Sequence, residues 1–166
     1  MGEGYCPECE EDLFKTRTTK EKEVINERVE QEIICVEAYL IDEHNVFVDF
    51  DGAGMDEYWF DPDDPGDPGI ISINDSHSDA LQLIILLHEA GHVIYRHKNN
   101  RPRTKILRET VEDKMDVLVE EVMAWYEGYK LSEQLGVRVD PELFEHNYSS
   151  SLIKYIKWVM FETEEN

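Results

Sequence analysis

Hydrophobic residues follow two different spacings along the chain. Between residues 33 and 74 they form short runs separated by turn-forming residues, a pattern typical of strands. From residue 79 onward they recur every three or four positions, which predicts amphipathic helices. The expected strands cover 33–41, 46–50, 58–60 and 70–74. The expected helices cover 79–97 and about 110–135, with a short helix from Asp140-Pro141 and a final helix over about 150–161.

These elements predict an α+β domain. A turn at Glu43-His44-Asn45 and an acidic, proline-rich loop over 61–69 separate the strands, which favours a meander sheet of three to four strands. The sheet is expected to pack on the helix at 79–97, with further helices following toward the C-terminus. We expect two regions: an N-terminal element with a CxxC motif and a charged segment over 1–32, and the main domain over 33–166.

The charge balance limits the partners of the protein. Asp and Glu number 38 against 16 Lys and Arg, a net charge of -22. Such a chain repels phosphate, so we expect no nucleic-acid binding through a basic patch and no contact with an anionic membrane. A protein or peptide is the expected partner, and the oligomeric state stays open. An acidic decoy for a basic partner is an alternative that this charge allows.

The cysteines do not suit a disulfide framework, because there are only three of them. With no signal peptide apparent and no apolar run long enough to span a bilayer, we expect a cytoplasmic protein. Cys6 and Cys9 have the spacing of a zinc knuckle, and Cys35 with His44 could complete such a site. A knuckle without metal is the favoured interpretation.

The motif with the clearest chemistry is His88-Glu89-Ala90-Gly91-His92, an HExxH sequence. Residues four apart share a helix face, so two imidazoles can reach one Zn²⁺, and the adjacent Glu89 can act as the general base. The same helical face carries mostly apolar residues, as expected of a buried helix: Leu81, Ile84, Ile85 and Tyr95. Gly91 predicts the close approach of another element. The strand at 70–74 could supply a sheet edge for an extended peptide. Two purely structural histidines are the alternative.

A zinc site of this kind needs a third ligand. The extended motif is absent, because Tyr95 and Lys98 occupy the positions where it needs Gly and His. A glutamate on the helix at 110–135 is the better candidate. Glu121 shares its stripe with apolar or small residues such as Ala124 and Gly128, whereas Glu120 shares its stripe with acidic residues and is expected to face solvent. Glu121 is therefore preferred over Glu120, and His97 and His146 are weaker candidates.

This combination of HExxH and a later Glu121-Val122-Met123-Ala124 resembles the gluzincin-type zinc metallopeptidases, and is similar to the ImmA/IrrE family and small phage-encoded metallopeptidase-like proteins. The resemblance covers about residues 70–135. It implies a zincin-like fold in which His88, His92 and Glu121 bind zinc and Glu89 is the catalytic base. The chain departs from the family where Trp125 follows Ala124, a place where members often have Asn.

The expected function is thus zinc-dependent hydrolysis of peptide bonds. Two alternatives remain: a catalytically silent zinc-containing module that binds a protein, and the acidic decoy without metal. Replacing Glu89 with Gln separates an enzyme from a binder, because Gln keeps the size of Glu but cannot accept a proton.

Overall fold

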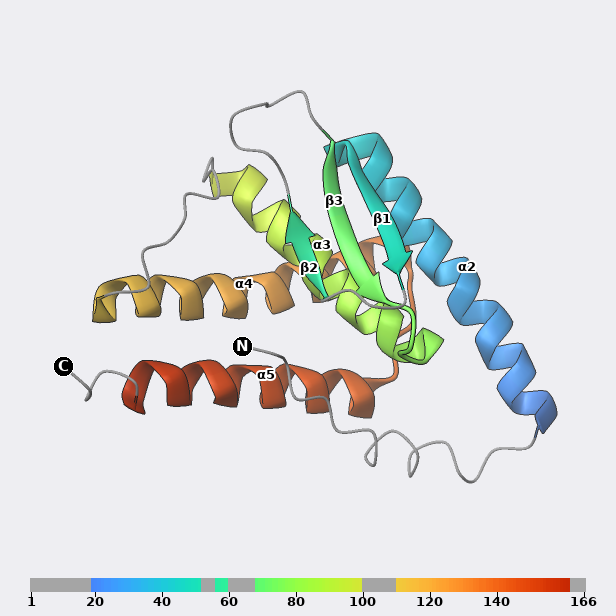
Figure 1. Ribbon diagram of the computed structural model, residues 1–166. Coiled ribbons are helices and arrows are strands. Elements are labelled where there is room, and N and C mark those ends of the chain that lie inside the picture. Colours follow the sequence, from blue (N-terminus) through green and yellow to red (C-terminus); the bar gives the residue numbers. More distant parts are fainter. Residues whose placement is uncertain (1–18, 52–55, 60–67, 100–109, 162–166) are drawn as a thin grey trace.

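The computed structural model describes residues 19–51, 56–59, 68–99 and 110–161, and these form an α+β fold, as predicted (Figure 1). The elements are α2 (Thr19–His44), β1 (Val46–Asp51), β2 (Glu57–Trp59), β3 (Gly69–Asn74), α3 (Asp79–Asn99), α4 (Val111–Leu135) and α5 (Pro141–Phe161). Residues 1–18 and 60–67 lie outside the described part, so the predictions for Cys6, Cys9 and most of the acidic loop are not addressed by it.

The sheet is mixed and not a meander. Its strand order is β1-β3-β2, with β1 parallel to β3 and β2 antiparallel to β3. A meander pairs strands that are neighbours in sequence, but here the last strand inserts between the first two. The sheet has three strands in the described ranges, so it is smaller than the sheet of four strands that the sequence allowed. The expectation that residues 70–74 form a sheet edge is also wrong, because β3 is central and β2 is the edge next to α3.

The expected strand at 33–41 is wrong, since these residues belong to the 26-residue helix α2. The apolar run Ile33-Ile34 has high strand propensity, but burial follows helical spacing. The residues buried along this helix are Val29, Ile33, Val36 and Leu40, whereas Ile34 is 53% exposed. The helix ends at a turn in which Asn45 has a positive φ of 54°. It runs without a break across residue 32, where the sequence suggested a boundary between regions.

Helix α3 lies at the centre of the molecule (Figure 1). The sheet and α2 contact it on one side and α4 on the other. A helix that is covered all round is expected to be apolar all round, and α3 is buried from Leu83 to Tyr95 apart from Ile85. The HExxH motif is therefore held inside the protein by its neighbours.

The two C-terminal helices begin where the sequence predicts. Thr110 caps α4 by accepting a hydrogen bond from the Asp113 backbone, and Gly136 ends the helix in the left-handed conformation. Asp140 caps α5 in the same way, accepting from the backbone of Leu143. The two separate helices expected after residue 140 form one helix, because Tyr148 packs in the middle of α5 against the α4 residue Trp125. Among the described helices, none combines the length and apolarity that crossing a membrane requires.

Candidate metal centre

The site is built where the backbones of α3 and α4 touch. A Cβ atom at Gly91 would lie 1.9 Å from the carbonyl oxygen of Ala124, and one at Gly128 would lie 2.2 Å from that of Leu87. Each glycine thus allows the partner helix to approach, and the close approach predicted from Gly91, Ala124 and Gly128 is confirmed. Side chains that project from the two helices at this contact therefore lie close together.

His88, His92 and Glu121 meet at this contact. The Nε2 atom of His88 lies 3.4 Å from one carboxylate oxygen of Glu121, and Nε2 of His92 lies 3.6 Å from the other. The two imidazole rings are 4.7 Å apart between centroids. All three side chains are largely buried. One carboxylate therefore spans the two ring nitrogens that an HExxH helix offers to a metal.

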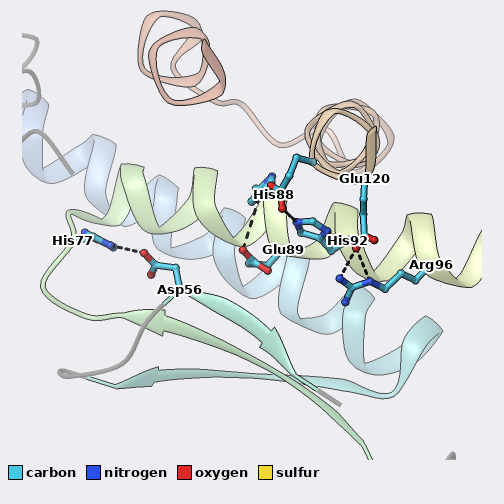
Figure 2. Close-up of polar contacts among 8 residues, drawn as sticks. Asp56, His77, His88, Glu89, His92, Arg96 and Glu120 are labelled. Atoms are coloured by element: carbon cyan, nitrogen blue, oxygen red, sulfur yellow. Dashed lines mark hydrogen bonds and ion pairs between the residues drawn. The ribbon is translucent and has the colours of Figure 1, made fainter. Parts of the chain in front are cut away.

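Glu89 joins the same group from α3 (Figure 2). Its Oε1 lies 3.9 Å from Nε2 of His88. His88, Glu89 and His92 each offer a ligand atom within 4.8 Å of the others, so this trio could also hold a metal ion. Glu121 approaches both imidazoles and Glu89 only one. Either carboxylate could therefore complete a set of three ligands with the two histidines.

Glu120 has a different position from the one expected. It is buried, not solvated, and it accepts a hydrogen bond from Nδ1 of His92 at 3.2 Å. Arg96, one turn after His92, also donates to Glu120, through Nε at 2.7 Å and through Nη2. Figure 2 shows Glu120 reaching from α4 toward Arg96. This role does not follow from the stripe of acidic residues that Glu120 shares; the signal for it in the sequence is the cation Arg96, four residues after His92.

The buried charged groups shift one another's pKa values. Burial lowers the pKa of His92, but hydrogen bonds with Glu120 and Glu121 outweigh it and raise the pKa to about 10. Burial opposes ionisation of Glu120, yet the hydrogen bond from His92 and the charge of Arg96 lower its pKa to about 2. The pKa of Glu121 is also lowered, against burial, by its contacts with His88 and His92. Two ionised carboxylates therefore face the histidines, and they are paired with the cations His92 and Arg96.

The two histidines have unequal surroundings. His92 is held by Glu120, whereas His88 stacks on the indole of Trp125, with ring centroids 4.3 Å apart. Nδ1 of His88 and Nε1 of Trp125 are both buried without a hydrogen-bond partner among the described residues. Trp125 in turn packs against Phe144 of α5. The last helix thus supports the site through an aromatic side chain.

The other candidate ligands lie elsewhere. Nδ1 of His97 faces Nδ1 of His44 at 2.6 Å, where the ends of α3 and α2 meet. His146 is exposed on α5, and Cys35 is an exposed free thiol on α2. Tyr126 and Tyr129 are also exposed, on α4.

A histidine–aspartate pair that the sequence did not reveal lies near the start of α3. Nε2 of His77 contacts a carboxylate oxygen of Asp56 at 2.9 Å, and the other oxygen accepts a hydrogen bond from the Asn74 backbone. In Figure 2 this pair lies at the end of α3 opposite Arg96. Asp56 immediately precedes β2, so the pair fixes the edge strand against β3 and α3. Residues 56 and 77 are distant in sequence, and no spacing rule connects them.

The donor set at the α3–α4 contact fits a zinc ion. Two imidazole nitrogens and one carboxylate are a ligand combination that catalytic zinc uses, with one position left for water or substrate. Comparisons of the chain with protein-family models, with curated proteins and with solved structures give no significant match. The assignment of function therefore depends on the geometry of this site.

Proposed function

We propose that the protein is a zinc-dependent peptidase, with His88, His92 and Glu121 as ligands and Glu89 as the general base. The observation that carries this proposal is the Glu121 carboxylate, which lies 3.4 Å and 3.6 Å from the two Nε2 atoms of the HExxH histidines. A buried glutamate between two histidines is satisfied either by a shared metal or by an ion pair with them, so the metal content of the protein decides between the two. A bound zinc would supply Lewis-acid chemistry, activating water and polarising a carbonyl group.

The residues of the chain have separate tasks in this proposal. Glu89 is a buried carboxylate beside the ligands and takes a proton from the attacking water, then delivers it to the leaving amine. Glu120 and Arg96 hold the imidazole of His92 in one orientation, because the Glu120 carboxylate accepts from Nδ1 and leaves Nε2 for the metal. The edge strand β2 could take an extended peptide alongside it by strand addition.

Glu89→Gln tests the catalytic part of the proposal. The protein should contain about one zinc ion per chain when purified without chelators, and Glu89→Gln should keep the zinc. Its hydrolysis of a mixed peptide library should fall by at least about 100-fold, because Gln cannot accept the proton. Glu30→Gln, an exposed change in α2, is the control and should leave both values unchanged.

Two results would refute the proposal in different ways. Absence of zinc from the purified protein, together with unchanged stability of His88→Ala, would remove the metal site. Zinc without hydrolysis in the unmodified protein would leave a metal-containing binding module.

A further inference from the structure

The face of α4 that points away from α3 is apolar and exposed. Met115, Val119, Tyr126 and Tyr129 are 43–52% exposed, and Val122 between them is partly exposed. We call these five residues the α4 seam. They lie opposite the face that carries Glu121 and Gly128, so the metal site does not explain them. Exposed apolar residues that are contiguous on one helix mark an interaction surface.

The spacing within the α4 seam is compatible with a helical partner. The five residues are separated by 4, 3, 4 and 3 positions, as on any stripe along one face of an α-helix. The same alternation forms the seam between two helices that pair side by side, so a second helix can pack along it.

We propose that this helix is α4 of a second copy of the chain, packed antiparallel. In an antiparallel pair, seam positions whose numbers have a constant sum lie opposite each other. A sum of 248 sets Val119 against the partner's Tyr129 and Val122 against the partner's Tyr126. Each valine then faces a tyrosine, and Met115 lies opposite the partner's Glu133 at the end of the interface.

The charges beside the α4 seam select the same register. Asp116 and Lys130 occupy equivalent heptad positions two repeats apart, and both are exposed. With valines facing tyrosines, Asp116 of one copy comes within about half a helical turn of the partner's Lys130, and the two-fold axis repeats the pair. In a parallel pair these equivalent flanking positions lie on opposite sides of the interface, so Asp116 would not meet the partner's Lys130. Opposite charges thus stabilise the antiparallel pair, although two chains of net charge -22 repel each other at long range.

Sedimentation equilibrium of the full chain at about 0.15 M salt, where the Debye length is about 8 Å, tests the proposal. A concentration-dependent equilibrium between monomer and dimer is expected. Val119→Glu should weaken the dimer by at least about tenfold, because it buries an unpaired charge. Phe47→Glu is the matched control: it adds the same charge at a residue that is 47% exposed on the sheet, and should leave the dimer unchanged.

Charge exchange tests the orientation and does not depend on the folding of Val119→Glu. Asp116→Lys and Lys130→Asp should each weaken the dimer, and the double variant should restore it, because every contact then pairs opposite charges again. A monomer at all concentrations would overturn the proposal. So would a dimer that Phe47→Glu abolishes and Val119→Glu does not, or a double variant as weak as the single ones. None of these outcomes depends on zinc or on hydrolysis.

Discussion

At the scale of single residues, two neighbouring glutamates on α4 make different contacts. Glu121 faces the Nε2 atoms of both histidines, whereas Glu120 faces Nδ1 of His92 and the guanidinium of Arg96. Consecutive residues of a helix are turned by about 100°, so Glu121 reaches the Nε2 side of His92 and Glu120 the Nδ1 side. This difference gives a direct comparison.

Glu121→Gln should reduce zinc affinity more than Glu120→Gln does. The first change removes a ligand charge, and we expect a loss of more than about 100-fold. The second weakens only the support of His92 and should cost about 10- to 100-fold. Competition with a chelating dye measures both affinities. A larger loss for Glu120→Gln would reverse the assigned roles.

Residue patterns predicted part of this arrangement. The expectation that Glu120 faces solvent failed, because a helix stripe rich in carboxylates can be buried when a neighbouring helix brings cations to it. Arg96 and Lys98 do this for Glu120 and Glu127. Both cations come from the last turns of α3, and a single-helix pattern does not contain that contact.

At the scale of elements, the site depends on how closely α3 and α4 approach. Gly91→Ala should push the helices apart, because the new Cβ would meet backbone atoms of Ala124, which cannot rotate away. We expect a loss of at least about 1–3 kcal/mol of unfolding free energy, together with weaker zinc binding. Chemical denaturation and zinc titration measure the two effects.

Gly136→Ala is the control for that change. It should cost about 1–2 kcal/mol through the left-handed backbone at φ 70°, but a Cβ there meets nothing within 4 Å. Zinc affinity should therefore stay unchanged. Equal losses of zinc affinity in the two variants would contradict the argument.

The contact between the ends of α2 and α3 makes stability depend on pH. Burial, together with the charges of His97 and Lys98, lowers the pKa of His44 from 6.5 to about 4. The hydroxyl group of Tyr39 contacts the other ring nitrogen of His44, Nε2. Between these pH values the unfolded chain binds more protons than the folded one, so stability falls as the pH falls from about 6.5 to 4.

His44→Asn should make this decline shallower. Urea unfolding at several pH values between 7.5 and 4 measures it, and the exposed His146→Asn is the control. If the slope of His44→Asn equalled that of the unmodified protein, the contact would not be the cause.

The elements themselves were predicted unevenly. The helices α3 and α4 and the strands β1 and β3 follow from periodicity and caps, because each has a local signal. The α2 prediction failed over 33–41, where β-branched residues favour a strand and only the spacing of Ile33, Val36 and Leu40 shows the helix. The strand order could not be derived, since nothing local tells β3 to insert between β1 and β2.

At the scale of the whole molecule, a metal bound at the proposed site should stabilise the fold. The proposed ligands come from two helices, and the unfolded chain does not hold them together, so metal binding would favour the folded state. Removing zinc with a chelator should lower the Tm by roughly 10 °C, for a site with free zinc near 1,000 times Kd. Differential scanning calorimetry measures this shift. In His88→Ala the chelator should have no effect, and an equal shift there would place the metal elsewhere.

The two glycines at the α3–α4 contact limit the substitutions that this protein can accept during evolution. Each position excludes a Cβ because of the backbone opposite it, so neither substitution can be compensated by trimming a side chain. Positions 91 and 128, which are 37 residues apart, are therefore under the same constraint: each has to be glycine for the two helices to touch. Lineages that keep the paired histidines should keep both glycines, and a lineage that loses one is free to lose the other and the metal with it.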